Sequence, residues 1–164
     1  MPGALVAQAE RLQGVCLGRG ITVAVAESCT GGLVAATITD VPGSSGYFLG
    51  AVVSYADAAK AAILGVPEAT LAAHGAVSAQ VAVAMATGAR ARFAAALAVS
   101  ITGVAGPDGG SESKPVGLTY IGIADGRGTD VRRFAFGSDR AGNREAAARE
   151  ALGWLIERAE AGAA

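Results

Sequence analysis

The pattern of apolar and polar positions predicts helices that alternate with short buried strands along the chain. Apolar residues recur at helical spacing in residues 4–17, 33–39, 56–64, 67–74, 78–93 and the segment that follows Asp139. Continuous apolar runs predict buried strands at residues 21–26, 51–55 and 97–102. Two further strands, 116–124 and 129–136, flank a turn sequence at 125–128 that is typical of an antiparallel hairpin.

This order of elements predicts one domain over residues 1–164, with an α/β fold. We expect a three-layer α/β/α sandwich on a mixed, mostly parallel sheet of about five strands with one antiparallel hairpin. No run of about 18 apolar residues is present, so a membrane span is not expected. The first residues lack a basic-then-apolar signal pattern, which favours a cytoplasmic protein.

Charge and cysteine content narrow the class of protein further. The formal net charge is −1, which disfavours nucleic acid as the main partner, because phosphate neutralisation needs clustered cations. The two cysteines, Cys16 and Cys29, are too few for a disulfide scaffold or a zinc site. With a single histidine besides, the sequence predicts neither a metal site nor a cofactor.

Polar side chains follow three of the predicted strands. Ser28 and Thr30 follow the first strand, Tyr55 ends the second and Thr102 ends the third. Because ligands bind at the carboxyl ends of strands in open α/β sheets, we expect these hydroxyls to line one cleft. For the first turn, the structural alternative is a helix cap made by Ser28 or Thr30. The glycine-rich segment 103–115 is too long for a plain connection, which favours a functional loop.

Lysine is rare in a chain that otherwise uses arginine. Of the thirteen cations, only Lys60 and Lys114 are lysine. An amine can lose its proton and a guanidinium cannot, so a serine paired with Lys60 is a candidate nucleophile and base. The alternative is a solvated helix lysine. His74 is better explained as a surface residue at a helix end, and Cys29 as a packing residue rather than a thiolate nucleophile.

Six motifs in register carry a resemblance to a known family. They are Ala-Glu-Ser-Cys-Thr-Gly-Gly (26–32), Pro-Gly-Ser-Ser (42–45), Val-Ser-Tyr (53–55) with Lys60, His-Gly-Ala-Val-Ser (74–78), Thr-Gly-Val-Ala-Gly-Pro-Asp-Gly-Gly (102–110) and Lys-Pro-Val-Gly (114–117). Together they resemble the CinA C-terminal domain family, the nicotinamide mononucleotide deamidases or nicotinamide-nucleotide amidohydrolases. The similarity runs from about residue 5 to residue 155 and indicates the stand-alone form of the family.

The resemblance implies hydrolysis of the carboxamide of nicotinamide mononucleotide, in pyridine nucleotide salvage. The products would be nicotinic acid mononucleotide and ammonia, and no metal would take part. The implied active site contains Ser28, Ser45, Tyr55, Lys60 and Thr102. We favour Ser45 as the nucleophile, with Lys60 as the base and Tyr55 relaying or positioning the proton; Ser28 as the nucleophile is the alternative.

The substrate phosphate suits glycine-rich backbone near a helix start, where N–H groups attract anions. The expected binding residues are Thr30, Gly31, Gly32, Thr102, Gly103, Gly106, Gly109 and Gly110. We also expect a homodimer. Two other functions compete with the enzyme. One is a non-catalytic nucleotide-binding module in which Lys60 is only a counter-charge, and the other is a partner protein in competence or DNA damage, which the acidic composition disfavours.

Overall fold

The computed structural model describes residues 2–163, which fold around one five-stranded sheet in the order β2-β1-β3-β4-β5. The strands are β1 (Val23–Glu27), β2 (Phe48–Val53), β3 (Leu97–Gly103), β4 (Leu118–Asp125) and β5 (Gly128–Ala135). Strand β1 pairs in parallel with β2 and β3, whereas β4 is antiparallel to both β3 and β5. The sheet is therefore mixed and ends in the predicted β4–β5 hairpin.

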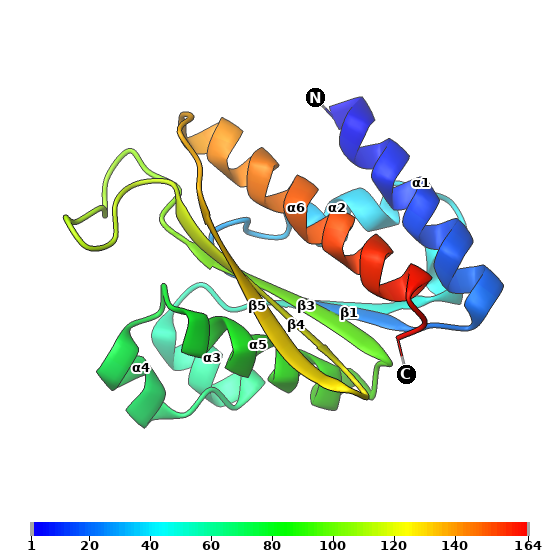
Figure 1. Ribbon diagram of the computed structural model, residues 1–164, viewed down its shortest axis with the longest axis horizontal. Coiled ribbons are helices and arrows are strands. Elements are labelled where there is room, and N and C mark those ends of the chain that lie inside the picture. The colour runs from blue at the N-terminus through cyan, green and yellow to red at the C-terminus, as the bar shows by residue number, and fades with distance from the viewer. Residues whose placement is uncertain (1, 164) are drawn as a thin grey trace.

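Helices cover both faces of this sheet (Figure 1). One layer contains α1 (Pro2–Arg19), α2 (Leu33–Thr39) and α6 (Arg140–Glu160). The other contains α3 (Asp57–Leu64), α4 (Glu68–His74) and α5 (Ala79–Phe93), with α5 against the sheet. A 3₁₀ turn, η1 (Ser44–Gly46), precedes β2. The α/β/α sandwich expected from the sequence is confirmed.

Side chains along the central strands point alternately to the two faces of the sheet, which divides the core in two. Val23 and Val25 of β1 face the layer of α1, α2 and α6, while Ala24 and Ala26 face α5. The residues on the α5 side are small, which lets this helix lie close to the sheet. At Gly122 of β4, an added Cβ would stand 2.4 Å from a backbone oxygen of α5. The alanine and glycine content of the chain thus reflects close packing of helix and sheet.

Strand β2 differs from its predicted bounds and thereby positions two candidate residues. The prediction began at residue 51, whereas the strand begins at Phe48, which pairs with Val23 at the start of β1. It ends at Val53, so Tyr55 lies beyond the strand, in the segment that leads into α3. None of the helices within residues 2–163 is long and apolar enough to cross a membrane.

Candidate active site

A cleft of about 270 Å³ opens at the carboxyl ends of the three parallel strands. Its lining residues are Ser28, Cys29, Tyr55, Lys60, Ala76, Val77, Thr102, Gly103, Val104, Ala105, Gly106, Asp108, Gly109 and Arg140. They come from the turn after β1, the segment after β2, the loop after β3 and the start of α6. The structure therefore brings together four of the predicted catalytic or hydroxyl-bearing residues: Ser28, Tyr55, Lys60 and Thr102.

Lys60 lies at the base of this cleft, with only 1% of its surface exposed. Its Nζ donates to the carbonyl oxygens of Ser54 at 2.8 Å and Tyr55 at 3.0 Å, and lies 3.0 Å from the Oγ of Ser28. Burial lowers the pKa of Lys60 below its ordinary value, although Asp57 and Cys29 act in the opposite direction. Within residues 2–163, every hydrogen bond that this amine makes goes to a neutral oxygen, and none goes to a carboxylate.

The three partners of Lys60 define what the amine can do. A neutral amine keeps two N–H donors and gains one lone pair. The carbonyl oxygens of Ser54 and Tyr55 can only accept, so they occupy the two donors. The charged amine donates its third N–H to the hydroxyl of Ser28, and in the neutral form the lone pair would face that hydroxyl instead. A neutral lysine in this position could accept a proton from the serine hydroxyl, which is the arrangement that a serine–lysine mechanism requires.

Backbone hydrogen bonds between neighbouring strands continue past the ends of the strands and bring Ser28 and Lys60 side by side. Beyond β1, the N–H of Ser28 donates to the carbonyl of Ile101 in β3 at 3.0 Å. The N–H of Ser54 donates to the carbonyl of Glu27 at 2.9 Å. Ser28 and Ser54 are thus held at the ends of neighbouring strands, and α3 begins soon enough after Ser54 to return Lys60 beneath them.

Glu27 has a structural role that the sequence analysis did not assign. Its buried carboxylate accepts from the N–H groups of Val34 and Ala35, each at 3.0 Å, and so caps α2. The N-cap residue of α2 is Gly32, which has a positive φ of 103° and no side chain to do this. Capping by Ser28 or Thr30 is therefore wrong.

The same cap corrects the predicted phosphate site. The N–H groups at the start of α2 are occupied by a carboxylate of the protein itself, which leaves no place there for a phosphate. Thr30, Gly31 and Gly32 do not line the cleft, and neither does Gly110. Among the predicted binding glycines, Gly103, Gly106 and Gly109 do line it.

Ser45 lies away from the cleft. It belongs to η1, which immediately precedes β2, at the end of the sheet where β1 also begins. The length of β1, five residues, separates this end from Ser28, which is roughly 16 Å at about 3.3 Å per residue. Within one chain, Lys60 therefore contacts Ser28 and not Ser45, which the preferred assignment had placed next to it.

Tyr55 and Arg140 form the outer wall of the cleft. The Tyr55 ring is 60% exposed, and its hydroxyl accepts from Nη2 of Arg140 at 3.2 Å; only its backbone oxygen contacts Lys60. Nη1 of Arg140 donates to the carbonyl of Gly106 at 2.8 Å. Sequence reasoning missed Arg140. The sequence does place this cation in the first turn of a helix, where it opposes the helix dipole. Such an unfavourable position could have indicated a role other than stabilising the helix.

The remaining candidate residues either make hydrogen bonds that hold the fold together or, in the case of Cys29, stay in an unreactive protonated form. Thr102 is buried and its hydroxyl donates to the carbonyl of Ala76 at 2.8 Å, which joins β3 to the segment before α5. Burial raises the pKa of Cys29 to about 11, so its thiol stays protonated at neutral pH. His74 does not line the cleft, and its backbone oxygen accepts from the Lys114 amine. No group of three or more His, Cys, Asp or Glu that could hold a metal occurs within residues 2–163.

Comparison with known proteins identifies the family and agrees with this fold. The CinA C-terminal domain family matches residues 6–159, and the chain belongs to that family. A CinA-like protein of Geobacter sulfurreducens is 54% identical over 140 residues, which are 85% of this chain and 34% of that protein. A putative competence-damage inducible protein of Moorella thermoacetica is 56% identical over 123 residues, 74% of this chain and 30% of that protein. The chain thus spans about a third of the length of the curated relatives it matches.

Solved structures of the same superfamily share the whole fold. The competence/damage inducible protein CihA from Agrobacterium tumefaciens superposes with a TM-score of 0.93 at 41% identity, and 96% of each chain is covered. A competence-damaged protein (CinA) superfamily protein from Klebsiella pneumoniae superposes with a TM-score of 0.92 at 30% identity, covering 96% of this chain and 98% of that one.

Proposed function

We propose that this chain is an amidohydrolase that deamidates nicotinamide mononucleotide by a metal-independent serine–lysine mechanism. The observation that carries the proposal is the 3.0 Å contact between the buried amine of Lys60 and the hydroxyl of Ser28, inside a cleft open to a small molecule. The resemblance of the motifs to the nicotinamide mononucleotide deamidases supports the choice of substrate, and membership of the CinA C-terminal domain family agrees with it.

In the first half-reaction, neutral Lys60 takes the proton of Ser28 as the Oγ attacks the carboxamide carbon. Negative charge develops on the carboxamide oxygen, where backbone N–H donors stabilise it. The tetrahedral intermediate then collapses, the C–N bond breaks, and Lys60 returns the proton to the leaving nitrogen, which departs as ammonia. An ester of the pyridine carboxylate with Ser28 remains.

In the second half-reaction, water replaces Ser28. Lys60 takes a proton from the water, which attacks the ester carbon, and returns it to Oγ as the ester bond breaks. The products are nicotinic acid mononucleotide and free enzyme. One water is consumed and one ammonia released in each cycle, and no cofactor is needed.

The outer part of the cleft would hold the remainder of the nucleotide. Arg140 offers the guanidinium best placed for the phosphate, because it lines the cleft beside the backbone of Gly106 and Gly109. Tyr55, held by Arg140, would position the pyridine ring or the proton in transit. In this assignment, Thr102 orders the cleft wall through its bond to the segment before α5.

The proposal includes a homodimer. Strand β2 is an edge strand, and its large apolar residues are exposed, with Leu49 at 43% and Val53 at 48%. Exposed apolar edges of this kind pair with another chain. Light scattering after size exclusion should give twice the 16.0 kDa chain mass, and a charged residue at position 53 should shift the protein to the monomer.

One assay tests the enzymatic proposal against its alternatives. Purified protein is incubated with a panel of nucleotide amides, and ammonia and nicotinic acid mononucleotide are quantified. Release from the mononucleotide, lost in Ser28→Ala, supports the hydrolase. Binding without release would favour the nucleotide-binding module, and duplex DNA binding with neither would favour the partner protein that the relatives' names suggest.

A further inference from the structure

The start of α6 carries three polar side chains that bind the backbone of both loops around the cleft. Arg140 and Asn143 donate to the carbonyls of Gly106 and Ala105, and so hold the loop after β3. Arg144 holds the turn after β1 instead. Its Nε donates to the carbonyl of Cys29 at 3.2 Å and its Nη2 to that of Thr30 at 2.8 Å.

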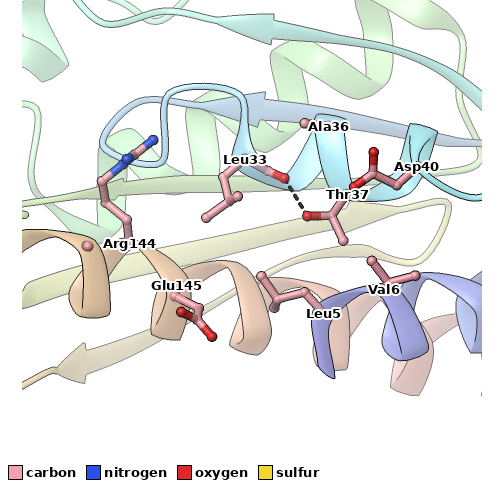
Figure 2. A pocket seen from close by; sticks show the side chains of 9 residues that line it. Leu5, Val6, Leu33, Ala36, Thr37, Asp40, Arg144 and Glu145 are labelled. Atoms are coloured by element: carbon pink, nitrogen blue, oxygen red, sulfur yellow. Dashed lines mark hydrogen bonds between the residues drawn. The ribbon is translucent and has the colours of Figure 1, made fainter. Parts of the chain in front are cut away.

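Figure 2 shows Arg144 reaching from α6 toward the segment before α2, while neighbouring Glu145 points elsewhere. Both hydrogen-bond partners of the guanidinium are neutral backbone carbonyls. Its charge acts at the turn, where it lowers the pKa of Cys29, although burial has the larger, opposite effect. A positive charge at this place favours an oxyanion beside Ser28.

The two bonds also fix the orientation of the peptides that follow Ser28. The peptide between Cys29 and Thr30 is trans, so its N–H points opposite to the carbonyl that Arg144 holds, away from α6. The next peptide is fixed twice, since the Thr30 oxygen also accepts from the N–H of Leu33 at 3.1 Å. The N–H of Gly31 is occupied by the carbonyl of Ser28. The Cys29 N–H has no hydrogen bond to another residue within 2–163.

We propose that Arg144 is a positioning residue, which holds the turn of residues 28–32 so that Ser28 and the N–H group of Cys29, which both line the cleft, face the same reacting carbonyl. Arg144 does not touch the substrate in this role. It acts through the backbone of the turn and through the field of its charge. The inference rests on the proposed function and deepens it, because it assigns an oxyanion donor and the group that aligns it.

A cleft of about 210 Å³ on the far side of Arg144 makes the proposal testable by chemical rescue. The cleft lies between α1, α2 and α6, and its walls include Leu5, Leu33 and the stem of Arg144 (Figure 2). Truncation of Arg144 would open this space to the carbonyls of the turn. A small guanidinium ion can then enter and donate to both oxygens, as the side chain did.

The experiment compares Arg144→Ala and Arg144→Lys with the control Arg149→Ala, which removes an exposed arginine five residues further along α6. We expect Arg144→Ala to lower kcat by about 10- to 100-fold, with KM changed less than about threefold. Methylguanidinium at non-denaturing concentration should restore part of kcat, and methylammonium or urea should not. Arg144→Lys should be intermediate, because a single ammonium does not reproduce the planar fork. Arg149→Ala should match the parent.

Hydrogen exchange of the segment 28–36 provides a readout that is independent of substrate. Exchange should rise in Arg144→Ala and fall again with methylguanidinium. Parental kcat with parental exchange in Arg144→Ala would overturn the inference and leave the hydrolase intact, and so would a loss that methylguanidinium does not rescue. If the parent releases no ammonia, the proposed function fails, and the exchange result alone decides whether Arg144 holds the turn.

Discussion

The amine of Lys60 lies 3.0 Å from the hydroxyl of Ser28, although 32 residues separate them in the chain. Two N–H groups of the amine donate to the backbone carbonyls of Ser54 and Tyr55, and burial lowers the pKa of Lys60. In the proposed function, this lysine is neutral and accepts a proton from serine, rather than being a cation that neutralises a substrate phosphate. The predictions below separate these two roles and test the residues around them.

Lys60→Arg keeps the positive charge but removes the base, since a guanidinium is not deprotonated in proteins. We expect kcat to fall by about 10²- to 10⁴-fold, the usual range for loss of a general base, with binding of the mononucleotide changed less than about tenfold. In the parent, kcat should rise with pH through the lowered pKa of Lys60, and this limb should be absent from the variant. Near-parental turnover in Lys60→Arg would make Lys60 a counter-charge.

Comparison with Lys60→Met tests the protonation state of Lys60 through the pH dependence of the free energy of unfolding. Because the folded pKa of Lys60 is lowered, the unfolded chain binds more protons between that pKa and the ordinary value of about 10.4. The free energy of unfolding of the parent should therefore rise with pH relative to the methionine variant, by at most about 1.4 kcal/mol per pH unit. Urea titrations over a pH series measure this difference, and parallel curves at all pH values would contradict it.

Ser28→Ala and Ser45→Ala form a matched pair. Ser28→Ala should lower kcat by about a thousandfold or more, because it removes the nucleophile next to Lys60. Ser45→Ala, at the opposite end of β1, should stay within about threefold of the parent, as for other exposed positions. Ammonia release and thermal unfolding of both variants check this. A large loss at Ser45 alone would mean that a second copy of the chain supplies the nucleophile.

Cys29→Ala should retain turnover within about threefold, and iodoacetamide should not inactivate the parent at neutral pH. The thiol lines the cleft, but burial raises its pKa to about 11, so the reactive thiolate is scarce. Steady-state kinetics with mass spectrometry of the alkylated protein measures both effects. A loss of about a thousandfold in Cys29→Ala would instead assign the nucleophile to sulfur.

Glu27→Ala should destabilise the fold rather than change the chemistry. It leaves the N–H groups of Val34 and Ala35 without an acceptor, at a cost of about 1–3 kcal/mol for the buried donor of Val34 and less for the partly exposed donor of Ala35. Glu27→Gln, which keeps one oxygen, should lose less. Denaturant unfolding measures both, with the exposed Glu68→Gln as the control. If the pH dependence of kcat changed in Glu27→Gln while stability did not, Glu27 would be a base rather than a cap.

Nicotinamide riboside, which lacks the phosphate, should be a poorer substrate than the mononucleotide. A charge-assisted contact of Arg140 with the phosphate implies a factor of about 10 to 100 in kcat/KM. Arg140→Ala should reduce this discrimination by losing activity mainly on the mononucleotide, whereas the exposed Arg133→Ala should not. Competition kinetics with the two substrates measures the ratio. Equal values in the parent would remove the phosphate role of Arg140.

Local sequence patterns determined much of the architecture. Alternation and helical spacing placed the strands and helices, because burial of apolar side chains follows the period of each element. The same reasoning put Ser28, Tyr55 and Thr102 at strand ends, and the structure brings them to one cleft. Strand boundaries differ from the prediction where pairing with a neighbour, as between Phe48 and Val23, extends a strand beyond its apolar run.

Tertiary structure decided which residues meet. Ser28 and Ser45 both stand in polar turns next to a strand, but parallel pairing of β1 with β2 puts the start of β2 at the far end of the sheet from Lys60. Likewise, the carboxylate of Glu27 takes the helix start that the glycine turn had suggested for phosphate. Arg140 and Arg144 reach the cleft and its turn only because α6 packs across the strand ends, more than 80 residues along the chain from Tyr55 and Cys29. Periodicity reports which side of an element is buried, whereas contacts between distant segments depend on strand order and direction, which no local pattern encodes.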